Sequence, residues 1–479
     1  MKLSALAAAT VSPDPEITGL TADSRQVRDG FLFAALPGVK ADGAAFIPQA
    51  EKRGASAVLA RPGAQTALPI IEDDNPRKRL AEMAARFYPQ QPEMIVGITG
   101  TNGKTSTAHF AEQIWSRAGR AAGRLGTLGA VGSGYERKLV HTTPEPVLLH
   151  ETLQAMAGAG VTHLAMEVSS HGLAQYRADG VRFQIAAFSN ITQDHLDYHA
   201  SFEDYFAAKL RLFDELVAND GAVVVNADGE GAARVADSAR RRGLTIVATG
   251  AAGADIKLLS CEALPDGLSL AFEIEGGKFT ARPRLIGAFQ AENALLAAGI
   301  ALASGVAPKK IVEAIGLLEG APGRMQHIGG PAGAGVIIDY AHTPDAIATA
   351  LAAIRPHASA RVIAIIGAGG DRDRSKRPLM GAAAIQNADM VIVTDDNPRS
   401  EDASAIRAEV MAGSPGASEI GDRADAIAAG VAMLQEGDVL MVLGKGHETG
   451  QQVGDETLPF DDVEVASAAV KARNREISQ

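Results

Sequence analysis

The chain has 479 residues, which is too long for one ordinary hydrophobic core and predicts about three domains of roughly 150 residues each. Apolar residues make up 46% and charged residues 21%, so the composition excludes a largely disordered chain. The net charge of -12 argues against broad binding to nucleic-acid backbones, although a local positive pocket for one anionic small molecule is compatible with it. Small-molecule chemistry is the leading expectation.

The chain opens on an apolar segment, residues 1–11, that superficially resembles a signal peptide. Its apolar run barely reaches the minimum length of such a signal and contains Ser4 and Thr10, so we predict a short helix. No stretch approaches the roughly 20 apolar residues that a membrane span needs. The single cysteine, Cys261, cannot form an intramolecular disulfide and is expected to be a small buried apolar residue. These features favour a cytoplasmic protein without a membrane span.

Apolar runs alternate with alanine-rich helical patterns, which predicts an α/β fold with parallel sheets. Segments rich in proline or glycine at residues 88–92 and 320–324 predict domains at residues 1-88, 89-325 and 326-479. Because parallel sheets place ligands at the carboxyl ends of their strands, residues that follow each strand are the candidates for a site. The predicted strands are residues 94–99, 163–168, 184–190, 222–226, 335–340, 361–367, 389–394 and 438–443.

A glycine-rich loop follows the strand predicted over residues 94–99 and precedes a predicted helix. This order aims backbone N–H groups and the helix dipole at phosphate. Lys104 is expected to reach the outer phosphates, and Thr105 to hold magnesium through its hydroxyl. Ile98 stands where a strict Walker A motif has glycine, and the alternative is a turn that only connects strand to helix. We predict an ATP site formed by Gly100, Thr101, Asn102, Gly103, Lys104, Thr105 and Ser106.

Metal-capable side chains follow the next two predicted strands. Glu167 lies near the end of the strand over residues 163–168, where a magnesium ligand would be useful, although a helix cap is the alternative. Residues 190–199, which include His195, cluster metal-capable side chains directly after another strand. Such a cluster is a polar loop about as often as a ligand set.

The pentapeptide Asp-Asp-Asn-Pro-Arg occurs twice, at residues 73–77 and 395–399. Aspartate or asparagine before proline is a common helix start, which alone could explain both copies. The second copy follows the strand over residues 389–394, and we predict that it opens a helix. Its N–H groups and Arg399 could then bind a carboxylate.

Taken together, these residues resemble the Mur ligase family, and within it the enzymes that add meso-diaminopimelate to the peptide stem of peptidoglycan. The resemblance covers nearly the whole chain. Its motifs are Asp23-Ser24-Arg25, the loop at Gly100, Thr142-Thr143-Pro144, residues 167–172 and 194–197, Gly287-Ala288-Phe289 with Asn293, and residues 339–342, 369–372 and 444–448.

The resemblance implies an N-terminal domain for the uridine nucleotide, a central P-loop ATPase domain with a parallel sheet, and a C-terminal Rossmann-like domain for the incoming amino acid. It implies that ATP and Mg²⁺ serve to phosphorylate the D-glutamate carboxylate of UDP-N-acetylmuramoyl-L-alanyl-D-glutamate, and that the amine of meso-diaminopimelate then attacks. The expected partners are these small molecules, with no nucleic acid, and the expected state is a monomer.

The resemblance also implies catalytic and nucleotide-binding residues. A lone helical lysine such as Lys209 is usually a solvated surface charge, but the family position implies a carbamylated lysine that binds a second magnesium. The implied catalytic residues are Lys104, Glu167, His195 and Lys209, and the implied metal ligands are Thr105, Glu167, His195 and Lys209. Outside the loop, the implied ATP contacts are Asn293, Arg324 and Asp339.

Three further sets of contacts follow from the resemblance. His141 and Gln290 depart from the asparagines expected at their positions, which puts the sugar-side contact at His141 in doubt. The implied uridine contacts are Ala22, Ser24, Val39, Lys40 and Ala41, and the sugar-peptide contacts are Thr142, Thr143, Ser169, Gln175 and Arg177. The implied amino-acid contacts are Arg372, Asp396, Asn397, Pro398, Arg399, Gly444 and Glu448.

Arg399 favours diaminopimelate over lysine, because a planar arginine pairs with the distal carboxylate that lysine lacks. An L-lysine-adding ligase is the nearest alternative. A ligase like folylpolyglutamate synthetase shares the glycine loop, but the N-terminal and Asp-Asn-Pro-Arg resemblances count against it. A GTP-dependent switch is a further alternative, although the sequence has no Asn-Lys-x-Asp guanine-reading motif.

Overall fold

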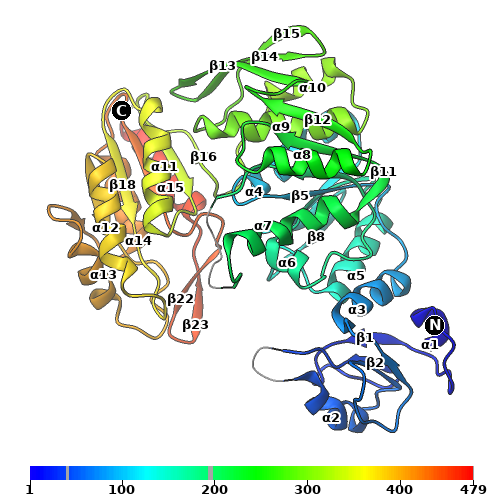
Figure 1. Cartoon of the computed structure of the whole chain (residues 1–479). Coiled ribbons are helices and arrows are strands. Elements are labelled where there is room, and N and C mark those ends of the chain that lie inside the picture. Colours follow the sequence, from blue (N-terminus) through cyan, green and yellow to red (C-terminus); the bar gives the residue numbers. More distant parts are fainter. Residues whose placement is uncertain (39–41, 193–197, 478–479) are drawn as a thin grey trace. The chain divides into compact units, whose positions relative to one another are not determined.

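The computed structural model describes residues 1–38, 42–192 and 198–477 (Figure 1). The chain forms two compact units. The first unit comprises Met1–Ala108 and Gly119–Val247, and the second comprises His109–Ala118 and Ala248–Gln479. Each unit contains the sheets and helices that position one part of the candidate site.

A four-stranded parallel sheet begins the first unit. Its order is β1 (Gly19–Thr21), β2 (Phe31–Ala34), β3 (Ala57–Ala60) and β4 (Ile70–Glu72). Residues that alternate along the strands pack in two separate cores, one against α1 (Leu3–Ala7) and α3 (Pro76–Phe87), the other against α2 (Ile47–Lys52). The predicted short helix at the start of the chain is confirmed by α1.

The second sheet of the first unit is parallel at its centre. Within this unit its order is β11 (Val217–Asn226), β10 (Phe183–Phe188), β5 (Met94–Thr99), β9 (His163–Glu167) and β6 (Ala122–Gly126), followed by the antiparallel strands β7 (Gly129–Gly132) and β8 (Tyr135–Arg137). The connecting helices are α4 (Lys104–Arg117), α5 (Pro146–Gly158), α6 (Ser170–Ala174), α7 (Phe202–Arg211) and α8 (Ala232–Arg241). Since the central strands are parallel, the residues after β5, β9 and β10 meet at one edge.

The second unit contains an antiparallel segment, β13 (Ile256–Leu264), β14 (Gly267–Ile274) and β15 (Gly277–Ala281), which follows β12 (Thr245–Gly250). Helices α9 (Phe289–Ala303) and α10 (Pro308–Ile315) come next in the chain. Cys261 lies on β13 and is only partly buried, so the expectation of a fully buried cysteine is wrong. Cys261 is not among the buried core residues, because every second side chain of a strand faces away from the core.

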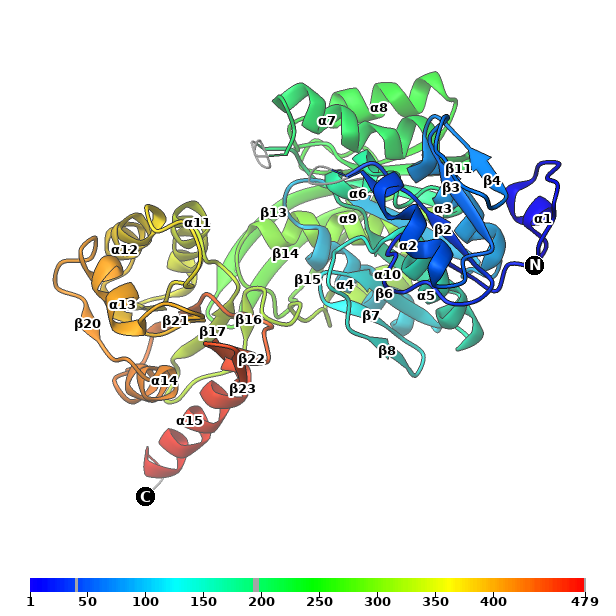
Figure 2. The same cartoon turned by 90° about the horizontal axis from the view of Figure 1, so that it is seen from below.

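The six-stranded sheet of the second unit has a helix layer on each face. Its order is β16 (Gln326–His327), β17 (Gly335–Asp339), β21 (Val439–Leu443), β18 (Val362–Ile366), β19 (Met390–Val393) and β20 (Ser418–Glu419), with only β16 antiparallel. One core packs against α11 (Pro344–Ile354), α12 (Lys376–Asn387) and α13 (Ala403–Met411), and the other against α14 (Arg423–Ala432) and α15 (Asp462–Ile477) (Figure 2). A separate hairpin joins β22 (Gly450–Val453) to β23 (Glu456–Pro459).

The predicted α/β class is confirmed, and a strand occurs in each of the eight segments predicted to contain one. No helix or strand covers residues 88–92, but the exact domain limits stay predictions. Within residues 1–38, 42–192 and 198–477, no helix has the combined length and apolarity required to cross a membrane.

Candidate functional site

The glycine-rich loop lies between β5 and α4, as the sequence predicts. Strand β5 continues through Ile98, which pairs with Glu167 of β9, so the loop begins only at Gly100. A side chain at Gly100 would place Cβ 2.0 Å from the Ser189 hydroxyl, and its φ of +149° also favours glycine. Ile98 replaces the first glycine of a strict Walker A motif because this residue still belongs to β5, so the loop is shorter than in that motif. The glycine at position 100 is required by the backbone conformation and by the close contact with Ser189.

Residues after β10 hold the loop in place. The Asn190 carbonyl accepts the Thr101 N–H at 2.9 Å, and its side-chain oxygen accepts the Asn102 N–H at 3.1 Å. The Ser189 hydroxyl donates to the Asn102 carbonyl at 2.6 Å. Asn190 belongs to the predicted metal-capable cluster, but these bonds make it a support for the loop. His195 and residues 193–197 of that cluster lie outside the described residues.

The Lys104 ammonium folds back onto the loop that it follows. It donates to the carbonyls of Gly100 and Thr101, both at 2.9 Å. These two hydrogen bonds hold the ammonium near the N-terminus of α4. An outer phosphate at this position would be attracted by both the ammonium and the helix dipole.

Glu167 is buried at the end of β9 and accepts three hydrogen bonds beside the loop. One carboxylate oxygen accepts the Thr127 N–H at 2.9 Å, and the other accepts the hydroxyls of Thr105 at 2.9 Å and Thr127 at 3.2 Å. Glu167 and Thr105 thus form a hard oxygen pair, the donor type that Mg²⁺ prefers. The alternative of a helix cap is wrong for Glu167, because the Ser169 hydroxyl caps α6.

Lys209 on α7 is buried against the same loop. Its ammonium donates to the Gly100 carbonyl at 2.7 Å and lies 4.5 Å from the Tyr205 ring centroid. Only 1% of Lys209 is exposed, so the expectation of a solvated surface lysine, based on residue type, is wrong. Its role as a carbamylated metal ligand, which the family resemblance implies, stays a prediction.

The implied sugar-peptide contacts form one hydrogen-bonded group near the end of β9. The Thr143 hydroxyl accepts the Ser169 N–H at 3.0 Å, and its carbonyl accepts Arg177 Nη1 at 2.9 Å. Arg177 also donates to the Gln175 side-chain oxygen at 2.8 Å. Thr142 shares a 3.0 Å hydroxyl contact with Thr127, which links this group to Glu167.

The implied uridine residues are only partly described. Ser24 is buried and donates to the Gln49 side chain at 2.8 Å, whereas Ala22 is exposed. Val39, Lys40 and Ala41 lie outside the described residues.

Two implied ATP contacts of the second unit are fixed by their neighbours. Asn293 on α9 is buried and donates to the Gln290 side-chain oxygen at 2.9 Å, so Gln290 orients its carboxamide. The two carboxylate oxygens of Asp339 accept the N–H groups of Met325, at 2.7 Å, and Ala341, at 2.8 Å. Burial raises the pKa of Asp339, while these N–H groups lower it.

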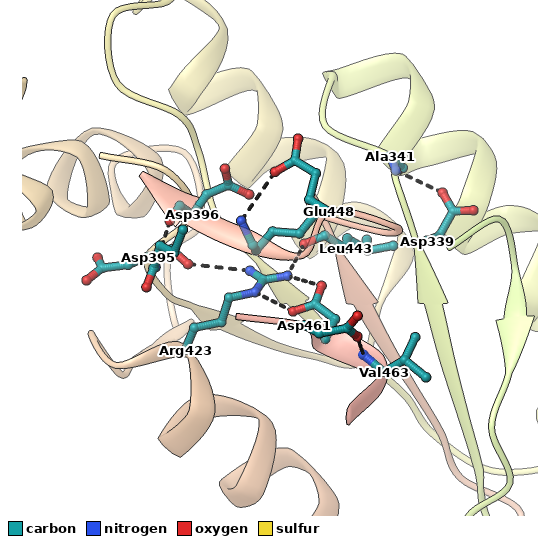
Figure 3. Close-up of polar contacts among 12 residues, drawn as sticks. Asp339, Ala341, Asp395, Asp396, Arg423, Leu443, Glu448, Asp461 and Val463 are labelled. Atoms are coloured by element: carbon teal, nitrogen blue, oxygen red, sulfur yellow. Dashed lines mark hydrogen bonds and ion pairs between the residues drawn. The ribbon is translucent and has the colours of Figure 1, made fainter. Parts of the chain in front are cut away.

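Arg324, which directly precedes Met325, lies over the Tyr340 ring at 4.7 Å. Asp339 therefore fixes the main chain next to Arg324 as well as the end of β17. Figure 3 shows the Asp339 carboxylate and the Ala341 N–H that it accepts.

A cavity of about 370 Å³ lies at the carboxyl ends of β18, β19 and β21 in the second unit. All the predicted amino-acid contacts except Pro398 line it. Its cationic lining residues are Arg372, Lys376, Arg377 and Arg399, and its anionic ones are Asp373, Asp396 and Glu448. Both signs of charge line the cavity, as a zwitterionic ligand requires.

Arg399, one of the four cationic lining residues, lies against a pair of glycines. Its Nη1 donates to the Gly370 carbonyl at 2.7 Å, and a Cβ on Gly369 would lie 2.7 Å from the same nitrogen. Arg377 supports this region from a fully buried position and bonds to Glu401 and Glu409. Its hydrogen bonds lower the pKa of Glu401 to about 2.

The two Asp-Asp-Asn-Pro-Arg copies differ in structure. The first opens α3, with Asn75 as N-cap and Pro76 at the first helical position. The prediction that the second copy opens a helix is wrong, because α13 begins at Ala403 with Asp402 as its cap. In the second copy, Asn397 is buried and hydrogen-bonded to neighbouring segments. Tertiary contacts thus determine the conformation of the second copy.

Replacing Asn75 with alanine is expected to destabilise α3 by about 1 kcal/mol, because the Lys78 N–H loses its side-chain acceptor. Hydrogen exchange of the α3 amides measures this change. Asn75→Ser, which keeps an oxygen acceptor, is the matched control and should retain wild-type protection. Equal exchange in the alanine and serine variants would contradict the role of the cap.

Comparison with known proteins places the chain in a family. Family models match in three segments: "Mur ligase family, catalytic domain" over residues 16–88, "Mur ligase middle domain" over residues 98–301, and "Mur ligase, glutamate ligase domain" over residues 323–446. A UDP-N-acetylmuramoyl-L-alanyl-D-glutamate--2,6-diaminopimelate ligase of Bradyrhizobium diazoefficiens is 49% identical over 470 residues, which cover 96% of both chains. The chain belongs to the Mur ligase family.

Two further relatives support the same assignment. The enzyme of that name from Caulobacter vibrioides is 50% identical over 459 residues and 94% of both chains. The solved structure of another such ligase has a TM-score of 0.75 and 32% identity over 99% of both chains. The predicted resemblance and the three-domain α/β fold of Mur ligases are confirmed.

In this Mur ligase, sequence reasoning missed two buried cations behind the cavity. The Lys445 ammonium donates to the Asn397 side-chain oxygen at 3.1 Å, Glu448 at 3.3 Å and the Gly450 carbonyl at 2.6 Å. The signal for Lys445 is its place between two glycines directly after β21. Arg423 at the start of α14 has no comparable local signal.

Arg423 pairs with Asp462 at 2.7 Å, and both side chains are fully buried. Its guanidinium also donates to the carbonyls of Leu443, at 3.0 Å, and Asp395, at 3.4 Å. Figure 3 shows Arg423 between these two carbonyls, which belong to the residues just before Gly444 and Asp396. Arg423 thus supports two segments of the cavity wall from behind.

Proposed function

We propose that this Mur ligase is an ATP-dependent amide ligase that adds meso-diaminopimelate to the D-glutamate carboxylate of UDP-N-acetylmuramoyl-L-alanyl-D-glutamate. The observation that carries the proposal is the charged cavity around Arg399 in a chain that is 49% identical to a ligase named for these substrates. The reaction releases ADP and phosphate and belongs to peptidoglycan precursor synthesis.

The proposed reaction has two steps that balance. A glutamate carboxylate oxygen attacks the terminal phosphorus of ATP, the bond to the bridging oxygen breaks, and ADP leaves. The amine nitrogen of diaminopimelate then attacks the acyl carbon, loses a proton and expels phosphate. Activation is needed because an oxide is a very poor leaving group, whereas phosphate leaves readily.

The loop residues supply charge stabilisation in the first step. The N–H groups at the start of α4 and the Lys104 ammonium attract the negative charge that develops on the transferred phosphoryl group. Thr142, Thr143, Ser169, Gln175 and Arg177 orient the sugar-peptide, and Ala22, Ser24 and residues 39–41 contact the uridine. Asn293, Arg324 and Asp339 complete ATP binding.

Mg²⁺ fits the described donors, because the Glu167 carboxylate and the Thr105 hydroxyl are hard oxygens that already contact each other. The bound ion would neutralise charge on the phosphates. In this proposal His195 is a further ligand. The Lys209 amine, after losing a proton, would add to CO₂ and release a second proton, which gives an anionic carbamate whose oxygens would hold a second ion.

The cavity in the second unit supports diaminopimelate as the amine substrate. Arg399 and Arg372 bind the distal carboxylate, which lysine does not have. Asp396, Asn397, Glu448 and the main chain at Gly444 bind the distal ammonium group. The distal carboxylate and the distal ammonium are both paired when diaminopimelate occupies the cavity. Lysine would leave Arg399 and Arg372 without a carboxylate partner.

Phosphate release with ATP, Mg²⁺ and the UDP-muramoyl dipeptide tests the proposal by comparing meso-diaminopimelate with L-lysine. We expect release to depend on the dipeptide and to be much faster with diaminopimelate. If lysine were the better substrate, the chain would be a lysine-adding ligase. Stimulation by neither amino acid would contradict the amide-ligase assignment.

The remaining alternatives predict different acceptors. A ligase like folylpolyglutamate synthetase would release phosphate with a folate acceptor and glutamate, and a GTP-dependent switch would bind GTP tightly without any amino-acid dependence. We also propose that the enzyme is cytoplasmic and monomeric.

A further inference from the structure

We propose that Gln451 is a positioning residue for amino-acid binding, and that the β22–β23 hairpin sets the conformation of residues 396–399. This inference rests on the proposed function, because it concerns the same cavity. Gln451 does not line the cavity, and none of the contacts implied by the family resemblance includes it.

The hairpin is hydrogen-bonded to three residues of the segment from Asp396 to Arg399. The Gln451 Nε2 donates to the Asp396 carbonyl at 2.7 Å, and the Gln452 N–H donates to the Asn397 side-chain oxygen at 2.9 Å. The Arg399 N–H donates to the Gln452 carbonyl at 3.0 Å, and the Gly454 N–H donates to the Arg399 carbonyl at 2.7 Å. One strand of the hairpin thus contacts three of the cavity-lining residues in this segment.

Arg399 needs such external support because its backbone has φ of +51°, in the left-handed region. A residue with a Cβ pays an energetic cost in that region. The two main-chain bonds to the hairpin offset this cost and fix the direction in which the side chain leaves the backbone. The guanidinium then reaches the Gly370 carbonyl.

Gln451 fixes the other end of the segment. Its bond holds the peptide group between Asp396 and Asn397, both of which line the cavity. The space beside Asp396 is narrow, since a Cβ on Gly444 would lie 2.7 Å from its carboxylate. Small rotations of this peptide group would therefore move the Asp396 carboxylate relative to Gly444, directly after β21, and shift the residues that follow it.

Gln451 is also the suitable side chain to test. The contacts of Gln452, Arg399 and Gly454 with each other use main-chain atoms, which substitution does not remove. Lys445 is fully buried, so its replacement would leave Glu448 without its cation. Gln451 is only partly buried, and methionine matches its length without a hydrogen-bond donor.

In Gln451→Met we expect KM for meso-diaminopimelate to rise about tenfold, the effect of losing one hydrogen bond of about 1.4 kcal/mol. Both kcat and KM for ATP should stay within about twofold, which a general loss of structure would not allow. Gln451→Glu, with the same shape but no N–H, should raise this KM at least as much. Glu456→Gln on β23 is the control and should behave as wild type.

A double-mutant cycle with Arg399→Ala tests whether Gln451 acts through the segment. We expect the Gln451→Met effect to fall to about twofold or less in the Arg399→Ala background, because coupled residues are not additive. The inference about Gln451 would be overturned, with the proposed function intact, by any of three results. These are an unchanged KM for meso-diaminopimelate in Gln451→Met, a rise in KM for ATP equal to the rise in KM for meso-diaminopimelate, and full additivity of the two substitutions. A wild-type enzyme that fails to use any amino acid would overturn the proposed function, and this inference with it.

Discussion

Arg399→Ala is expected to lower kcat/KM for meso-diaminopimelate by roughly 10⁴-fold, because the distal carboxylate would enter the cavity without its bidentate partner. The guanidinium is held ready at the Gly370 carbonyl, so little conformational freedom is lost when the carboxylate binds. Amino-acid-dependent phosphate release, measured over a range of diaminopimelate concentrations, gives this ratio directly.

The same variant should lose little with L-lysine, since lysine has no distal carboxylate for Arg399 to bind. The preference between the two amino acids is thus expected to collapse. Arg475→Ala, an exposed arginine on α15, is the matched control and should keep wild-type kinetics with both. An Arg399→Ala enzyme that still prefers diaminopimelate would show that other cavity residues determine specificity.

Lys104→Ala is expected to lower kcat by about 10³-fold, because the transferred phosphoryl group would lose the ammonium that stabilises its developing charge. The substitution also removes two hydrogen bonds to loop carbonyls, at Gly100 and Thr101. Single-turnover formation of ADP from saturating ATP separates this chemical effect from weaker nucleotide binding.

Two controls accompany the Lys104 prediction. Lys138→Ala removes an exposed lysine of the same unit and should leave turnover unchanged. Lys104→Arg keeps the charge but not the compact ammonium, so it should recover only part of the rate. Near-wild-type chemistry in Lys104→Ala would mean that this loop does not activate ATP.

Local sequence pattern predicted the strands and the glycine loop well, because continuous apolar runs bounded by glycine are typical of buried parallel strands. It was also sufficient to single out Glu167, which lies beside the loop after β5 simply because parallel strands end at a common edge. Lys209 shows the limit of residue type alone. Its burial depends on the packing of α7 against the loop, which its neighbours in sequence do not encode.

The second Asp-Asp-Asn-Pro-Arg copy shows why the rest of the cavity could not be predicted. The same five residues start helix α3, where Asn75 is the N-cap, but form a hydrogen-bonded segment without helix before α13, in which Arg399 has a left-handed backbone. The difference arises from Lys445 and the β22–β23 hairpin, which lie about 50 residues further along the chain. Arg377 and Arg423 are likewise defined only by partners distant in sequence.

The buried ion pair between Arg423 and Asp462 makes helix α15 part of the structure that supports the cavity wall. Asp462 is the first residue of α15, beyond every residue that lines the cavity. A chain cut before this position would keep all of the lining residues but leave an unpaired guanidinium behind the carbonyls of Leu443 and Asp395. An uncompensated buried charge costs about 3–5 kcal/mol, so the functional boundary of this domain extends past its last substrate-facing residue.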